Sequence, residues 1–244
     1  MQITPPFGYQ EIVPLQRKEK VRLLAPGEVP MFARALNAIP VSYAEFTLAS
    51  RQYPIVFTSG DDGGSFTPVA VLGMTAGENL FVAGATWDAG AYVPAYARRY
   101  PFCMAKVTLN QVEQQDRLIC VEKARIDEHG EPMFDDQGRP NDKWREIERL
   151  LTEYEADLER ARGMCAILVD YALLEPFTMQ ATLAKSGAMH LTGMHRVDEK
   201  KLEHLNAGQL KNLMRKGLMG RIYTHLLSLD NFTVLLERKA ARAA

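Results

Sequence analysis

Hydrophobic and polar positions follow two different periods along this chain. Between residues 53 and 83, short apolar runs are separated by clusters of turn-forming residues, which is typical of antiparallel strands joined by short turns. The apolar run within 66–74 is nearly continuous, which indicates a strand buried on both faces. The strands predicted by these criteria are 54–58, 66–74, 80–83, 102–109, 117–123, 177–184 and 188–197, with loops at 60–64, 110–116 and 185–187.

A helical period replaces this pattern over 142–174. Apolar residues recur there at alternating spacings of three and four, which gives one continuous apolar seam on a long helix. We predict that the seam either covers the sheet or pairs with a partner, and that Glu175-Pro176 ends the helix. The seam residues are Trp144, Ile147, Leu151, Tyr154, Leu158, Ala161, Cys165, Leu168 and Ala172.

Shorter helices are indicated by their capping residues. Ser42 and Glu45 form a capping-box pattern ahead of a helix over 43–52, and Asp198 and Asn206 are placed to cap helices near the C-terminus. The sequence therefore predicts an α+β fold with a mainly antiparallel sheet, one long covering helix and a helical C-terminal end.

The chain length and the positions of Pro and Gly set the expected domain organisation. The 244 residues suffice for a substantial core. Residues 1–30 are rich in proline and charge, so we expect an extended N-terminal arm followed by a single domain over 31–244. The polar, turn-rich stretch 127–141 is the candidate for an internal boundary.

Charge and hydropathy exclude several classes of function. Twenty-nine Lys and Arg against thirty Asp and Glu give a net charge of −1, which argues against binding nucleic acid through its phosphates. No apolar run reaches the roughly 18 residues of a membrane span, and no secretory signal follows the first basic residues. We therefore expect a cytoplasmic protein without membrane insertion, with export by a route that needs no cleavable signal as the alternative. The three cysteines are expected to be buried thiols in a reducing compartment.

Familiar catalytic and metal-binding patterns are missing from the sequence. The glycine-rich segment 60–64 joins two predicted strands and lacks the lysine of a phosphate-binding loop, so we interpret it as a turn. The acidic pairs at 61–62 and 135–136 lack the remaining ligands of a calcium loop. His190 and His195 are five apart and face opposite sides of a regular strand. We therefore predict no metal site and no cofactor.

One cluster has a composition suited to recognition. It joins aromatic rings, a carboxylate and two guanidinium groups, which together can bind a peptide, a glycan or an anionic ligand. A helix over 92–100 would place its tyrosines, four residues apart, on one face. The alternative is that the tyrosines pack on the sheet and the arginines are solvated or paired. The residues are Trp87, Asp88, Tyr92, Tyr96, Arg98, Arg99 and Tyr100.

The same region carries a family resemblance. The segments YPIVF (53–57), PVAVLGMTAGENLFV (68–82), WDAGAYVPAYARRYPF (87–102), EPMFDDQGRP (131–140) and GRIYTHLLSLDNF (220–232) resemble the SapC family of bacterial proteins. The resemblance extends over nearly the whole chain from about residue 30. It implies an association with bacterial surface-layer (S-layer) systems and assigns no catalytic residue.

Three hypotheses of function follow. The first is a non-catalytic binding or accessory protein for cell-surface assembly or modification, with a protein or peptide partner. The second is an enzyme, or the accessory subunit of one, with a pocket around Trp87–Tyr100. The third is a structural homodimer formed through helix 142–174.

Overall fold

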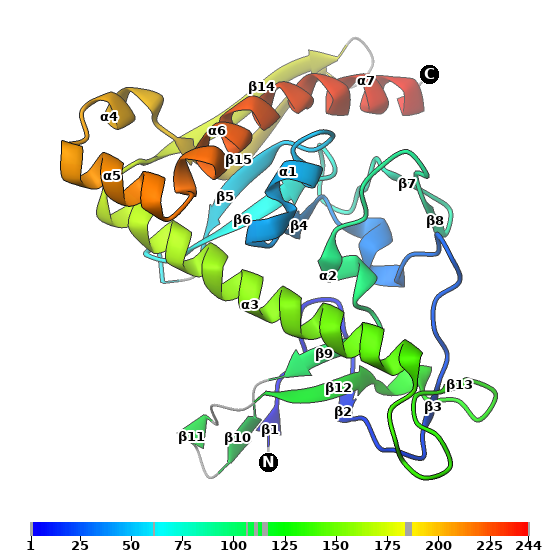
Figure 1. Cartoon of the computed structure of the whole chain (residues 1–244). Helices are drawn as coiled ribbons and strands as arrows, with labels where there is room; N and C mark the ends of the chain where they lie inside the picture. The colour runs from blue at the N-terminus through cyan, green and yellow to red at the C-terminus, as the bar shows by residue number, and fades with distance from the viewer. Residues whose placement is uncertain are drawn as a thin grey trace.

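The computed structural model describes residues 2–60, 62–105, 107–109, 112–113, 117–183 and 187–243. Most of the loop predicted at 110–116 and most of the turn predicted at 185–187 fall outside these residues, as does Asp61 of the loop 60–64. The described part of the first of these, Val112–Glu113, is a short strand and not a loop. The fold is α+β, as predicted. A large sheet lies at one end of the molecule, smaller sheets lie at the other, and one long helix runs past both (Figure 1).

The large sheet has five antiparallel strands with the central strand β5. The strand predicted to be buried on both faces, β6, is an interior strand between β5 and β4, and its residues from Val69 to Val71 are buried. The antiparallel pair predicted from the strands 177–184 and 188–197 is also confirmed, as β14 and β15. In spatial order the strands are β14 (Leu174–Leu183), β15 (Gly187–Val197), β5 (Ile55–Ser59), β6 (Phe66–Val71) and β4 (Ala38–Pro40).

The prediction that 80–83 forms a third strand of this sheet is wrong, because only Val82–Ala83 form a strand there and they pair elsewhere. The place beside β6 is taken by β4, which comes earlier in the chain. The Asn79 amide donates to the Ala33 carbonyl at 2.7 Å and its oxygen accepts from Phe81, so this part of the chain is fixed to the segment that precedes β4. The following residues form a separate two-stranded ribbon, β7 (Val82–Ala83) with β8 (Thr86–Trp87).

The smaller sheets combine the N-terminal arm with the middle of the chain. The pair predicted at 102–109 and 117–123 is confirmed in part, because β9 and β12 are antiparallel with Leu118 opposite Ala105, whereas Val107–Leu109 belong to another sheet. Residues 1–30 supply one strand to each of three small sheets, while the division at residue 30 stays a prediction. The sheets are β2 (Ile12–Pro14), β12 (Leu118–Glu122) and β9 (Phe102–Ala105); β1 (Gln2–Ile3), β10 (Val107–Leu109) and β11 (Val112–Glu113); and β13 (Glu131–Pro132) with β3 (Lys20–Val21).

The long helix, α3 (Asp142–Asp170), joins the two ends of the molecule (Figure 1). Its first half packs into the core of the small sheets through Trp144 and Leu151, and its second half packs into the main core through Met164 and Leu168. The apolar seam is therefore covered by the chain itself, which is the first of the two roles predicted for it. This burial removes the free apolar face on which the homodimer hypothesis was based.

The helix ends four residues earlier than predicted. Asp170 is its last residue, and Ala172 follows with a φ of 52°, which turns the chain into β14. Glu175 and Pro176 therefore lie in a strand, and they do not end the helix. The last residue of the predicted seam, Ala172, is exposed and lies beyond the helix, so the apolar spacing alone did not mark where the helix ends.

Asn141 caps the start of α3. Its side-chain oxygen accepts from the backbone N–H of Trp144 at 2.8 Å. We expect Asn141→Ala to lower the free energy of unfolding by about 1 kcal/mol, since a free N–H is left at the helix start. Chemical denaturation measures this loss. Asn141→Ser retains an acceptor and should keep most of the stability, so equal losses in both variants would contradict the capping role.

The remaining helices surround the large sheet. The capping box of Ser42 and Glu45 is confirmed, but the helix after it is shorter than predicted, with a 3-10 turn (Tyr43–Glu45) followed by α1 (Phe46–Ala49). The predicted caps at Asp198 and Asn206 are confirmed. The C-terminal helices are α4 (Glu199–Glu203), α5 (Ala207–Arg215), α6 (Leu218–Ser228) and α7 (Phe232–Ala243).

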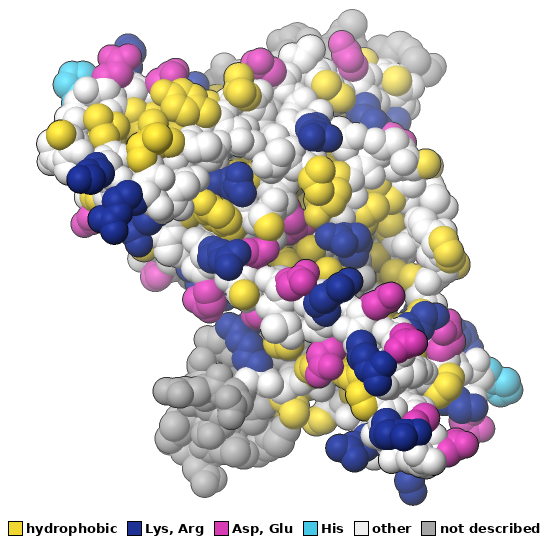
Figure 2. Space-filling view, viewed as in Figure 1, with side chains coloured by type: hydrophobic (Ala, Val, Ile, Leu, Met, Phe, Trp, Pro, Cys, Tyr) yellow, Lys and Arg dark blue, Asp and Glu magenta, His cyan; other side chains and the backbone are white. Residues whose placement is uncertain are grey.

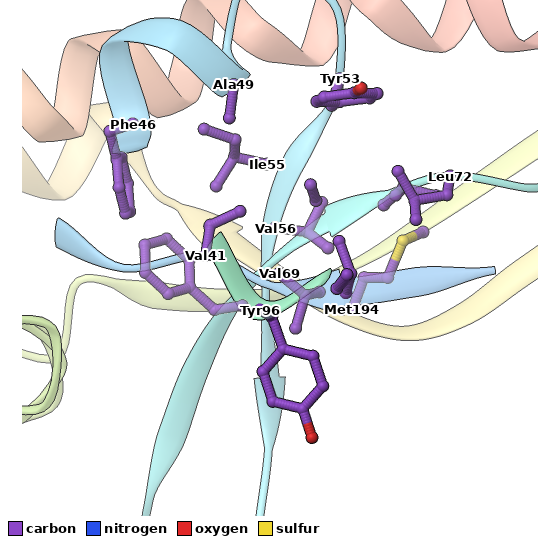
Figure 3. Packing of buried hydrophobic residues seen from close by; sticks show 14 of the residues in the cluster. Val41, Phe46, Ala49, Tyr53, Ile55, Val56, Val69, Leu72, Tyr96 and Met194 are labelled. Carbon is purple, nitrogen blue, oxygen red and sulfur yellow. The ribbon is translucent and has the colours of Figure 1, made fainter. Parts of the chain in front are cut away.

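Side chains from these layers meet in the main core. Ile55 and Val56 from β5 lie in one buried cluster with Phe46 of α1 and Met194 of β15 (Figure 3). Tyr96 lies at the edge of the same cluster, with its hydroxyl pointing away from it (Figure 3). This tyrosine connects the core to the candidate site.

Candidate functional site

The seven predicted site residues lie on one segment but not on one helix. The helix expected over 92–100 is wrong, because α2 (Ala95–Arg98) is a single turn. Pro94 precedes it with an extended backbone, φ −58° and ψ 145°. Tyr92 and Tyr100 therefore lie outside the helix, and the three tyrosines do not share a helical face. The segment places its residues in three separate environments.

Trp87 and Asp88 form the first environment, at the junction of β8 and α7. Trp87 is buried, and its indole N–H donates to the Tyr53 hydroxyl at 3.1 Å. Asp88 accepts from the Arg238 guanidinium at 2.8 Å and from the backbone of Gly90. The hydrogen bond from Arg238 is the main reason that the pKa of Asp88 is lowered. Both residues line a pocket of about 450 Å³ beside α7.

Tyr92 and Arg98 form the second environment, against the turn that leads into α1. The Tyr92 hydroxyl donates to Glu45 Oε1 at 2.9 Å and accepts from Arg98 Nη2 at 3.0 Å. The same carboxylate oxygen accepts from the Ala95 N–H at 2.6 Å, while Oε2 completes the capping box at Ser42. Burial, followed by the nearby Glu45 charge, raises the pKa of Tyr92. These contacts hold α2 against α1.

Arg99 is the centre of the third environment. Its side chain is only 4% exposed, and its Nη1 lies 3.7 Å from Glu155 Oε1 on α3. The guanidinium carbon lies 4.3 Å from the centre of the Tyr96 ring, 5.0 Å from Tyr154 and 5.7 Å from Tyr9. Such distances allow cation–π attraction to each ring. Within the described part of the chain, Arg99 Nε has no hydrogen-bond partner.

The tyrosines around Arg99 bind the N-terminal arm. Tyr96 donates its hydroxyl to the Phe7 carbonyl at 2.7 Å, and Tyr9 of the arm donates to the Phe102 carbonyl at 2.8 Å. The rings of Tyr9 and Tyr100 lie 5.3 Å apart. Part of the predicted recognition cluster therefore contacts a peptide segment of the same chain. Tyr9, Glu45, Tyr53 and Tyr154 complete the three environments, and the sequence analysis did not place them there.

A cleft of about 370 Å³ lies beside this segment, between residues 23–30, α2 and the first half of α3. Three predicted residues, Arg98, Arg99 and Tyr100, contribute to its lining. Most of the remaining wall is apolar, including Leu23, Leu24, Val29, Val93, Ile147 and Leu150. A concave apolar surface with a few polar groups at its wall is typical of binding sites.

The thiols and the fully buried histidine are in structural positions. Burial raises the pKa of Cys103 and of Cys165 to about 12, and that of Cys120 to about 11. A thiol with such a pKa is protonated at neutral pH and is a poor nucleophile. His225 contacts the backbone of β5 and β15 and is inaccessible to a substrate.

The acidic pairs at 61–62 and 135–136 are predicted to lie in turns, and Asp62 and Asp135 stabilise such turns through backbone N–H groups. Asp62 accepts from the backbone of Gly64 and Ser65, and Asp135 accepts from the backbone of Gln137 and Arg139. Asp61 lies outside the described residues. Among the residues that the structure describes, no group of three or more His, Cys, Asp or Glu is arranged to hold a metal ion.

Fold and site together define an α+β protein with an apolar cleft enclosed by its own N-terminal segment. The SapC family model matches residues 20–235, and the chain belongs to this family. Every residue that lines the cleft lies within the matched segment. No curated protein and no solved structure matches the chain. Within the described ranges, no helix is long and apolar enough to cross a membrane.

Proposed function

We propose that this SapC-family protein is a non-catalytic binding or accessory protein, and that the cleft between residues 23–30, α2 and α3 takes an apolar segment of a protein partner. The observation that carries the proposal is the cleft itself. Its walls come from three segments far apart in the sequence, and half-buried leucines and an isoleucine line it. Apolar side chains in such a cleft gain free energy when a partner removes them from water.

The polar groups at the cleft suit a peptide. The exposed Arg98 guanidinium donates from Nε to the Val93 carbonyl at 2.9 Å, which fixes its position at the wall. A guanidinium in a fixed position binds a carbonyl or carboxylate of an extended peptide. The nearby hydroxyls of Tyr96 and Tyr9 donate to main-chain carbonyls of the same chain, which supports the proposal that this region recognises peptide backbone.

The cellular setting belongs to the same proposal. The family resemblance implies the assembly or modification of the bacterial cell surface, and a cytoplasmic location is the expectation from the sequence. The protonated, buried thiols and the backbone-bound His225 favour binding over catalysis, because the enzyme hypothesis needs an accessible activated group near Trp87–Tyr100.

Photo-crosslinking in the source cells tests the proposal. A photoreactive amino acid is introduced at Leu150, at Leu24 on the opposite wall, or at Thr152, which is exposed on α3 but does not line the cleft. We expect the probes at 150 and 24 to join the same protein and the probe at 152 to miss it. Absence of an adduct at both cleft positions, or the same adduct at 152, would overturn the proposal.

Leu150→Arg is the variant designed to abolish partner binding in the cleft. The arginine fits a helix and its charge disfavours an apolar partner, so the crosslink from position 24 should fall at least about tenfold. Thermal unfolding and circular dichroism of the variant check that the fold is retained. Thr152→Arg adds the same charge outside the cleft and should leave the crosslink unchanged.

A further inference from the structure

An apolar surface lies on the outer side of α5 and α6. Tyr223 and Leu227 are one turn apart on α6 and are 44% and 72% exposed, whereas Leu218 and Ile222 on its other side are buried. Met214, near the end of α5, is 65% exposed. Figure 2 shows hydrophobic side chains gathered over this corner of the molecule, with Lys and Arg side chains beside them. We call Met214, Tyr223 and Leu227 the α5–α6 surface.

The stretch of chain that carries this surface has charges of one sign. Residues 204–229 contain no Asp or Glu, although acidic residues slightly outnumber basic ones in the whole chain. The same stretch contains Lys211, Arg215, Lys216 and Arg221. The first three are exposed, and none of them forms an ion pair with a described residue. Arg221 instead donates to the Tyr43 carbonyl at 3.0 Å. The free positive charges thus lie beside the exposed apolar side chains.

We propose that the α5–α6 surface docks the protein peripherally on an anionic phospholipid bilayer. Apolar side chains with flanking Lys and Arg on short amphipathic helices are suited to the bilayer interface, where the chains enter the headgroup region and the cations meet anionic lipid. Tyrosine is favoured at the same depth. A protein interface fits less well, because lysine is depleted there. The docking is independent of the partner cleft.

Vesicle sedimentation of the full chain tests this docking. We expect the protein to pellet with vesicles of phosphatidylglycerol and phosphatidylcholine in equal parts, and not with phosphatidylcholine alone. Added salt should weaken the binding, because it screens exposed charges. Replacing Lys211, Arg215 and Lys216 together by Gln should weaken it at least about tenfold. The control replaces Lys143, Arg145 and Arg149 on α3 by Gln, which removes the same charge elsewhere and should leave binding unchanged.

A second pair of variants tests the apolar part. Leu227→Gln should weaken vesicle binding several-fold, whereas Met31→Gln, at a position 77% exposed and outside this surface, should have no effect. Both side chains are exposed, so both variants are expected to fold. The proposal is overturned if the wild type fails to pellet with anionic vesicles, if it binds both vesicle types equally, or if the α3 control loses as much binding as the α5–α6 variant.

Discussion

Replacing Arg99 with alanine is expected to lower the free energy of unfolding by about 3 kcal/mol. The guanidinium is buried among the rings of Tyr9, Tyr96 and Tyr154 and lies near Glu155. Alanine removes all three cation–π contacts and leaves a cavity where the N-terminal arm and α2 meet α3. Glu155 keeps a second partner, Arg117, so its charge is not left alone. Denaturant unfolding of the purified protein measures the loss.

The neighbouring arginine supplies the control. Arg98 is exposed and contacts the Tyr92 hydroxyl and the Val93 carbonyl, so Arg98→Ala should cost less than about 1 kcal/mol. Arg99→Lys retains the charge but not the planar group that stacks on the rings, and should be intermediate. If Arg98→Ala and Arg99→Ala destabilise the protein equally, Arg99 does not have the central role assigned to it.

The N-terminal arm gives a second readout of the same site. Tyr9 joins the arm to Arg99 and to the Phe102 carbonyl. Loss of the guanidinium should therefore loosen the arm, and trypsin should cleave at Arg17, Lys18 or Lys20 faster in Arg99→Ala than in the wild type. A general loss of packing would instead raise cleavage throughout the chain.

The predictions that were confirmed depend on patterns among residues close together in the sequence. The caps at Ser42, Asp198 and Asn206 depend on residues two to three positions apart, and each forms as expected. The long helix was found because its spacing of apolar residues repeats over many turns. Strand neighbours, in contrast, depend on distant segments: β4 comes before β5 in the chain, yet it takes the edge where the third strand was expected.

The candidate site shows the same contrast between local patterns and contacts with distant segments. Composition singled out the segment from Trp87 to Tyr100, part of which lies where the arm, α2 and α3 meet, but it did not distinguish the buried Arg99 from the exposed Arg98. That difference depends on Tyr9 and Tyr154, which lie far away in the sequence. Glu45 offered one usable signal, because a capping box occupies one carboxylate oxygen and leaves the other for a second contact.

His225 is expected to make the protein sensitive to acid. Its ring is fully buried between α6 and the sheet: Nε2 accepts from the Val197 N–H at 3.1 Å, and Nδ1 donates to the Ile55 carbonyl at 2.7 Å. This arrangement requires the neutral ring. Burial is the main cause that lowers its pKa from 6.5 to about 4, and the positive charge of Arg196 acts in the same direction.

The sign of the pH dependence follows from this lowered pKa. Well above pH 6.5 the ring is neutral in both folded and unfolded chains, so the stability is fully present. As the pH falls toward about 4, the unfolded chain binds a proton that the folded protein does not, and about 3 kcal/mol should be lost. His225→Gln retains a donor and an acceptor but does not titrate, so its unfolding free energy should fall less over this range. The exposed His129→Gln should keep the wild-type dependence. Equal slopes in the wild type and in His225→Gln would show that acid acts through other groups.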